Sequence, residues 1–366
     1  DNIGGIVAVF EAPLTNYIRR YRVLNNKVHH NGQNWRANVV LGGILHKYPS
    51  SGTDPTRAYK DVIVDGNEVW DNEGYSISLY NGYNETFMSR VSRNHVHDNN
   101  QSEAFDSHSI FVARSFGVVV EENLIENNSG YAAGPHGTAC GVLIDTDATI
   151  NEGGDGCIVR RNVMDGGWPG YTMGGGGNES ANGQAGVFVI DNTNVLIEDN
   201  YIRGFFSGIG TYANTGGTPA TKLNGLVVRG NVIVDLLVSE SDKNAVGIAV
   251  RSGMDVVIEN NVFSNCRQGI WVHNSLTAPT ERNNCVYAPR NGVYYARSAS
   301  IDVATPTVAL DATDIITDPM LYGRGRPHIG SPLFDAGRPS ALRRRDVEGK
   351  QRPNPPSIGA HDVATL

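Results

Sequence analysis

Short runs of alternating apolar and polar residues return along this chain in one recurring phrase. Each copy has an alternating run, a polar residue, an Asn and a second alternating run. Alternation over so few residues predicts short β-strands rather than helices. The clearest copies are VIVDGNEVWDN (62–72), VVVEENLIENN (118–128), CIVRRNVMDGG (157–167), VLIEDNYIRGF (195–205), LVVRGNVIVDL (226–236) and VVIENNVFSNC (256–266).

A Gly-led strand follows most copies, as in GVLIDTD, GVFVIDN, GIAVRSG and GIWVHNS. The Asn-to-Asn interval is typically about 30 residues, and self-similarity on that scale predicts a solenoid. Three short strands per turn, with Asn tolerating the left-handed conformation at a tight corner, predict an all-β chain. The expected fold is a right-handed parallel β-helix of about ten coils, in which the Asn amides of successive coils stack into a ladder.

The repeats resemble the pectate-lyase-like superfamily of β-helix proteins across roughly residues 4–298. The segment GSPLFDAGRPSALRRRDVEGKQRPNPPSIGAHD (330–362) resembles the ending of many secreted bacterial β-helix proteins. This resemblance implies an extracellular or cell-surface protein of bacterial origin. We expect residues 1–300 to form the β-helix and residues 301–366 to form an irregular segment that packs on the last coils and covers an open strand edge.

Composition and cysteine spacing argue against several classes of binding partner. The net charge of −8 does not favour a nucleic-acid partner, and no apolar run approaches the roughly 18 residues of a membrane span. The four cysteines show no CxxC spacing, which argues against a zinc site built from them. A Cys140–Cys157 disulfide and plain buried thiols remain alternatives.

The Gly-led strands are expected to form the working face, because the ligand groove of the superfamily usually runs along that sheet. By strand parity, the second and fourth residues after the Gly point outward. Coils stacked about 4.8 Å apart would give a cleft about 40 Å long, suited to an extended polysaccharide. Aromatic and charged side chains there suit sugar rings, hydroxyls and uronate carboxylates. The predicted substrate-binding residues are Lys47, Tyr80, Arg114, Phe188, Tyr212, Arg251, Trp271 and His273.

Three acids on two neighbouring coils are the predicted catalytic residues. Asp145, Asp147 and Asp191 cluster on this face, and hydrolysis of a glycosidic bond needs two carboxyl groups that flank it. Crowding would raise the pKa of one of them, as a general acid requires. The leading hypothesis is therefore a glycoside hydrolase that needs no cofactor.

A polysaccharide lyase is the second hypothesis. Elimination from a uronate polymer needs a base, which Arg251, His273 or Lys47 would supply, and a group that neutralises the carboxylate. Calcium would serve the latter role, and the stretch DTDATINEGGDG (145–156) offers hard oxygen ligands. The candidate calcium ligands are Asp145, Asp147, Glu152 and Asp155.

Two further alternatives stay open. EAFDSH (103–108) resembles the YGFDPH motif of the mannuronan C5-epimerases at Phe105, Asp106 and His108, although Glu-Ala replaces Tyr-Gly and Ser replaces Pro. That resemblance implies a uronate epimerase. The last hypothesis is a non-catalytic carbohydrate-binding or structural β-helix of the adhesin or tailspike type. Four histidines beside the Asn corners (His29, His30, His95 and His97) are expected to be turn or surface residues rather than ligands.

Overall fold

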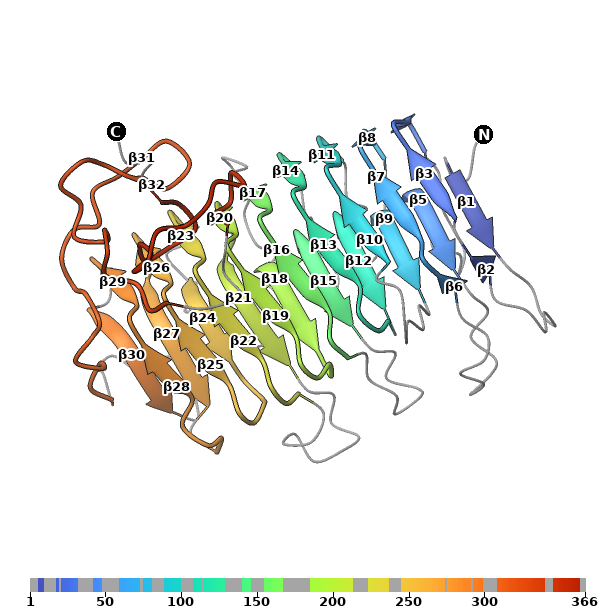
Figure 1. Ribbon diagram of the computed structural model, residues 1–366. Coiled ribbons are helices and arrows are strands. Elements are labelled where there is room, and N and C mark those ends of the chain that lie inside the picture. Colours follow the sequence, from blue (N-terminus) through green and yellow to red (C-terminus); the bar gives the residue numbers. More distant parts are fainter. Residues whose placement is uncertain are drawn as a thin grey trace.

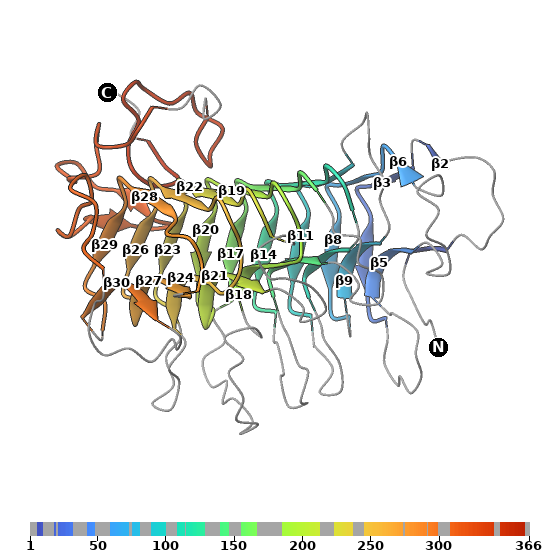
Figure 2. The same ribbon diagram turned by 90° about the horizontal axis from the view of Figure 1, so that it is seen from below.

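The protein is an all-β parallel solenoid, seen from two sides in Figures 1 and 2. The computed structural model describes residues 6–9, 18–19, 21–31, 42–47, 59–72, 75–80, 89–99, 108–113, 115–128, 140–145, 155–166, 185–212, 223–236, 245–273, 275–290, 292–298, 308–339 and 345–362. Within these ranges every regular element is a strand, and three parallel sheets run along the length of the molecule. The predicted β-helix is confirmed.

Each coil contributes at most one strand to each of the three sheets. Sheet I has ten strands: β1 (Ile6–Val9), β5 (Gly42–Lys47), β9 (Tyr75–Tyr80), β12 (Ile110–Ala113), β15 (Val142–Asp145), β18 (Ala185–Ile190), β21 (Ser207–Tyr212), β24 (Val246–Val250), β27 (Gln268–His273) and β30 (Val293–Ser298). Most of these are the Gly-led strands of the sequence, whereas Ser76, Ser109 and Tyr294 take the place of the Gly at β9, β12 and β30.

The recurring phrase supplies the other two sheets, one on each side of its Asn. Sheet II contains β3 (Arg22–Leu24), β7 (Ile63–Asp65), β10 (Arg90–Ser92), β13 (Val119–Glu121), β16 (Ile158–Arg160), β19 (Leu196–Glu198), β22 (Val227–Arg229), β25 (Val257–Glu259) and β28 (Thr280–Arg282). Sheet III contains β4 (Lys27–His29), β8 (Glu68–Trp70), β11 (His95–His97), β14 (Leu124–Glu126), β17 (Val163–Asp165), β20 (Tyr201–Arg203), β23 (Val232–Val234), β26 (Val262–Ser264) and β29 (Cys285–Tyr287). Two small pairs, β2 (Ile18–Arg19) with β6 (Tyr59–Lys60) and β31 (Leu321–Tyr322) with β32 (Arg326–Pro327), complete the described strands.

The core is a stack of aliphatic side chains that face the axis of the solenoid. The middle residue of most sheet II strands is buried and apolar, as with Val120, Val159 and Ile197. Because one inward side chain per strand repeats on every coil, each coil packs on its two neighbours and needs no other hydrophobic layer. The apolar positions of the alternating sequence pattern therefore identify the side chains that face the core.

The corner between sheets II and III carries the predicted Asn ladder. Asn162 donates from Nδ2 to Oδ1 of Asn200 at 2.9 Å, and Asn200 does the same to Asn231. The ladder contains Asn26, Asn67, Asn94, Asn123, Asn162, Asn200, Asn231, Asn261 and Asn284. A second ladder joins Asn31, Asn72, Asn99 and Asn128 at the other end of sheet III.

The explanation of the corner by a left-handed Asn was wrong. The residue before each ladder Asn has the positive φ, for example Glu122 (59°), Arg161 (53°) and Asp199 (56°). The Asn itself is required because its amide both donates and accepts, which links the coils on either side. In the pair Asn260-Asn261 the first residue adopts φ 58° and the second joins the ladder.

The Gly that begins the sheet I strands is required by close approach of the chain. A Cβ on Gly208 would lie 2.5 Å from the carbonyl oxygen of Gly247 and 2.5 Å from Cγ2 of Ile233. A Cβ on Gly247 would approach the carbonyl oxygen of Gly269 and the ring of Phe263 in the same way. A larger residue would therefore push adjacent coils apart at this corner.

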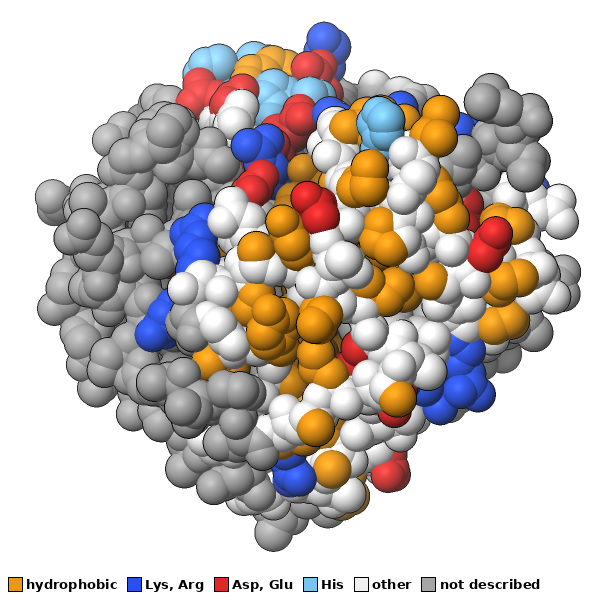
Figure 3. Space-filling view, turned by 90° about the vertical axis from the view of Figure 1, so that its left-hand side faces the viewer, with side chains coloured by type: hydrophobic (Ala, Val, Ile, Leu, Met, Phe, Trp, Pro, Cys, Tyr) orange, Lys and Arg blue, Asp and Glu red, His pale blue; other side chains and the backbone are white. Residues whose placement is uncertain are grey.

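The C-terminal segment packs on the last coils of the solenoid. Ile315 pairs with Cys285 of the edge strand β29, donating to Asn284 and accepting from Val286. Further on, Leu333, Ile358 and Ala360 lie against the outer face of sheet III. Figure 3, which views the molecule from this end, shows hydrophobic side chains gathered over it. The segment thus covers both an edge and a sheet face.

Buried ion pairs fasten the same segment. The guanidinium of Arg352 is 1% exposed and contacts Asp362 and Asp199, the latter at 2.7 Å. All four cysteines are buried free thiols, so the Cys140–Cys157 disulfide is not formed. The described part of the chain contains no helix long and apolar enough to cross a membrane.

Candidate functional site

The outer face of sheet I carries the predicted line of fourth-position residues. The strand register aligns Lys47, Tyr80, Ala113 and Asp145 on four successive coils, and Ile190 with Tyr212 further along. Arg251 and His273 follow the paired residues Val250 and Val272 and so continue the line. We call its described polar members Asp145, Tyr212, Arg251 and His273 the outer ladder; Ala113 and Ile190 are its described apolar members.

One detail of this prediction differs in the structure, and part of it is not tested. In the last coil His273 pairs with Ser298, not Ala296, because Tyr294 rather than Gly292 takes the place of the leading Gly. The side chains of Lys47 and Tyr80, and all of Arg114, Asp147 and Glu152, lie outside the described residues.

The second-position residues are buried, which corrects the expected exposed aromatic surface. Phe188 and Trp271 point away from the solenoid core but are only 1% and 3% exposed. Phe188 packs in a separate apolar cluster with Phe111 and Leu143, and Trp271 in one with Ala249. Strand parity predicts the direction of a side chain but not what packs over it. Phe188 and Trp271 therefore serve as packing residues, leaving the outer ladder as the polar surface.

Trp271 organises the polar residues at one end of the outer ladder. The guanidinium carbon of Arg251 lies 5.9 Å from the indole centroid, and the His273 ring meets the indole edge-on at 6.0 Å. The indole Nε1 donates to Oγ of Ser298 at 2.9 Å. A cation over an indole face is held without losing its hydrogen-bond donors. Arg251 is thus held against the indole on the outer face of sheet I, where a guanidinium suits an anionic or hydroxylated ligand.

The two described acids lie near the middle of sheet I. Ile144 pairs with Val189, so Asp145 and Asp191 follow the last paired residues by one and two positions on adjacent coils. Coil spacing and strand rise together put their backbones about 6 Å apart. Asp145 is half-buried, whereas Asp191 is 4% exposed and sits at a corner with φ 47°. The register therefore brings together two of the three predicted catalytic acids.

Asp155 has a structural role at another corner. Its Oδ1 accepts hydrogen bonds from Thr193 Oγ1 and Asn194 Nδ2, both at 2.7 Å. Among the described residues, neither Asp155 nor Asp145 belongs to a group of three potential metal ligands. The calcium site stays a prediction, since Asp147 and Glu152 lie outside the described residues.

His108, the one described residue of the epimerase-like motif that matches, is fully buried beside sheet I. Burial lowers the pKa of its imidazole to about 3. Its Nδ1 accepts a hydrogen bond from the Cys140 backbone at 3.1 Å, and its ring stacks on Tyr75 at 5.3 Å. The environment holds His108 neutral and packed in place. Phe105 and Asp106 lie outside the described residues.

Sheet II carries an alternating charge ladder that the sequence analysis missed. Glu198 pairs with Arg229 at 2.8 Å, and neighbouring coils repeat the pattern. The outward ladder runs Glu121, Arg160, Glu198, Arg229, Glu259 and Arg282. The signal was present two residues before each ladder Asn from Asn123 to Asn284, where acid and base alternate. These pairs tie coils together and occupy this face with structural charges.

Comparisons with known proteins identify the fold. The profile of the right-handed β-helix region matches residues 15–162 and 140–308. A search of the curated proteins returned no match. Among solved structures, the chain is similar to the A-module of the Azotobacter vinelandii mannuronan C-5 epimerase AlgE6, with 14% identity, TM-score 0.53, and 86% of this chain and 78% of that chain covered. It is also similar to a tailspike protein double mutant of E. coli bacteriophage HK620, with 15% identity, TM-score 0.53, and 87% and 58% covered. These likenesses and the profile agree with the stacked parallel sheets, and the chain belongs to the right-handed β-helix family.

Proposed function

We propose that the protein binds an extended polysaccharide along the outer ladder and cleaves its glycosidic bonds, with Asp145 and Asp191 as the acid and base. The observation that carries the proposal is the register of sheet I. It aligns an acid, an aromatic phenol, a guanidinium and an imidazole on one face of the solenoid, with Ile190 on the coil between the acid and the phenol. A polymer that lies across the strands would meet these groups in order.

The spacing suits a chain of sugars better than a single small ligand. From Asp145 to His273 the ladder spans four coil steps, or about 19 Å. Sheet II is occupied by its own ion pairs, and the far half of sheet III is covered by the C-terminal segment. Among the described surfaces, sheet I therefore offers a line of polar side chains that neither an inter-coil ion-pair ladder nor the C-terminal segment occupies.

Two carboxylates on adjacent coils fit glycoside hydrolysis. Their backbone separation of about 6 Å is compatible with the carboxyl distances of both retaining (about 5.5 Å) and inverting (about 6.5–9.5 Å) enzymes. One carboxyl group would protonate the leaving oxygen while the other attacks the anomeric carbon or activates water. Similarity to an epimerase module and to a tailspike protein is in keeping with a glycan ligand.

Elimination from a uronate polymer is the second candidate, and the Arg251–Trp271–His273 arrangement favours it. Arg251 would pair with the uronate carboxylate, and His273 would take the proton from C5. The two mechanisms leave different products, since elimination creates an unsaturated sugar and hydrolysis does not.

The test is incubation with a panel of neutral and uronate polysaccharides, following reducing ends and absorbance near 235 nm together. Reducing ends without absorbance, lost by at least roughly a hundredfold in Asp145→Asn or Asp191→Asn, would support hydrolysis. Asp255→Asn is the matched control, because Asp255 is exposed at another corner with φ 53°, which Asn also adopts. Both signals rising together would favour elimination and should be lost in His273→Ala. No product from any glycan would contradict catalysis, and no binding would contradict the proposal as a whole.

A further inference from the structure

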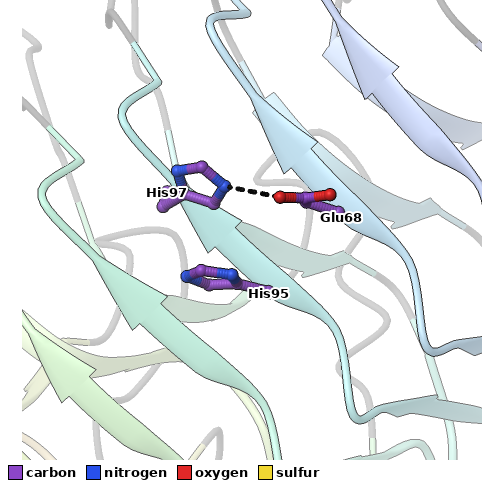
Figure 4. Close-up of side chains that lie close together, drawn as sticks. All are labelled: Glu68, His95 and His97. Carbon is purple, nitrogen blue, oxygen red and sulfur yellow. Dashed lines mark ion pairs between the residues drawn. The ribbon is translucent and has the colours of Figure 1, made fainter.

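A second set of functional side chains lies on sheet III, near the N-terminal end of the solenoid. Glu68 projects from β8, and His95 and His97 project from the adjacent strand β11 (Figure 4). Glu68 pairs with His95 in the strand register, and His97 stands two residues further along the same strand. Parity puts all three on the outer face, opposite the buried Val69 and Val96.

The three side chains converge as metal ligands do. One ligand atom from each lies within 4.8 Å of the other two. Nε2 of His97 is 3.5 Å from Oε1 of Glu68, and the two imidazole centroids are 4.1 Å apart. Ligand atoms around a tetrahedral zinc ion, at bond lengths of about 2.0–2.1 Å, stand roughly 3.3 Å from one another. Small side-chain movements would therefore close the cluster around an ion.

His97 is held in a ligand-ready orientation. Its Nδ1 is 2.8 Å from Oδ2 of Asp98, and its buried Nε2 faces Oε1 of Glu68 at 3.5 Å. A carboxylate on one ring nitrogen fixes the imidazole and increases the basicity of the other nitrogen. Trp70 stacks parallel to the His97 ring at 5.9 Å and limits its rotation.

Charged side chains beside the cluster would compete with a metal ion for its ligand atoms. Lys27 pairs with Oε2 of Glu68 at 3.0 Å. This leaves Oε1 toward the histidines, and the Lys27 side chain is 73% exposed and can withdraw into solvent. On the other flank Glu126 lies 3.2 Å from Nε2 of His95 and also pairs with Arg324.

We propose that Glu68, His95 and His97 form a binding site for a divalent transition-metal ion of the zinc class. Two imidazoles and one carboxylate suit Zn²⁺, whereas Ca²⁺ and Mg²⁺ prefer sites built from oxygen ligands. Three protein ligands leave a fourth position for water or an exogenous ligand. The ion would join β8 to β11 and so cross-link two adjacent coils on a face separate from the outer ladder.

The experiment is calorimetric titration of the metal-free full chain, without a polyhistidine tag, with Zn²⁺. One ion per chain is expected, with a raised unfolding temperature. Co²⁺ in its place should give the visible d–d bands of a low-coordinate nitrogen and oxygen site. Asp98→Asn, which keeps a residue that tolerates the φ of 48° at this corner, should weaken binding about 10- to 100-fold.

Opposing variants keep the proposal falsifiable. His95→Ala and His97→Gln should abolish the stoichiometric site, whereas Lys27→Met should tighten it by removing the competing cation. His328→Gln is the matched control, because that imidazole lies exposed in the C-terminal segment. Binding that survives in both His95→Ala and His97→Gln, or the absence of binding by the wild-type chain at millimolar Zn²⁺, would overturn the assignment.

Discussion

Replacing Asn200 with alanine removes one amide from the middle of the Asn ladder. Nδ2 of Asn200 donates to the Val159 carbonyl and to Oδ1 of Asn231, both at 2.9 Å. Oδ1 accepts from the backbone and side chain of Asn162 at 3.0 and 2.9 Å. The side chain is fully buried, so the partners that lose these bonds have no ready access to water.

The magnitude follows from those four hydrogen bonds. At a net value of about 1 kcal/mol each, and with the added penalty of leaving buried partners unsatisfied, the variant should lose about 4–6 kcal/mol of unfolding free energy. Urea denaturation gives this difference. Hydrogen exchange should place the change in the coils that hold Asn162, Asn200 and Asn231, because repeats in a solenoid contact only their neighbours.

Asn224→Ala is the matched control for this experiment. Asn224 lies at another corner, is partly exposed, and its side chain makes no hydrogen bond with the described part of the chain. Its replacement should change stability by less than about 0.5 kcal/mol. Equal losses in the two variants would refute the assignment of corner stability to the ladder amides.

Three further predictions concern charged and titratable groups. Arg229→Met leaves the buried carboxylate of Glu198 without its closest partner and should cost about 3–5 kcal/mol of unfolding free energy, measured by thermal or urea unfolding. Adding Glu198→Gln should recover much of this loss. An equal loss in the single and double variants would contradict the prediction. Burial and the nearby Asp314 raise the pKa of Glu281 from 4.5 to about 8. The folded chain therefore retains a proton that the unfolded chain releases. Stability should fall by about 2 kcal/mol, after allowance for partial exposure, as pH rises from about 5 to 8. Glu281→Gln should flatten this pH dependence, and an unchanged slope in that variant would contradict the prediction. Burial lowers the pKa of His108 from 6.5 to about 3. Below pH 6.5 the unfolded chain therefore binds a proton that the folded chain does not, and stability should fall as pH drops from 6.5 to about 3. The NMR shifts of the imidazole nitrogens should show a neutral ring at about pH 5, and a titration midpoint near 6.5 would disprove the assignment.

Much of the fold was predictable because the solenoid repeats one physical requirement. Each strand must present an apolar residue to the core, and each corner must satisfy its backbone groups, so the pattern returns with every coil. The line from Asp145 to His273 follows from parity alone. The last coil departed by two residues because Tyr294, not a Gly, occupies the close approach to β27.

The site was less predictable, because the alternation of apolar and polar residues specifies where a side chain points but not what packs around it. Phe188 and Trp271 point outward as expected but are buried by packing that no local pattern reports. The Glu68–His95–His97 cluster depends on which strands are neighbours, which requires the register as well as the sequence. The charge ladder could have been found by comparing Glu198 and Arg229 across the aligned repeats.

The most direct test of the central claim is a crystal structure of the Asp145→Asn variant with an oligosaccharide of the polysaccharide that the protein acts on. The account predicts sugar density along the outer face of sheet I, crossing the coils of Asp145, Tyr212, Arg251 and His273. A carbohydrate bound instead along sheet II, along sheet III or on the C-terminal segment would contradict it.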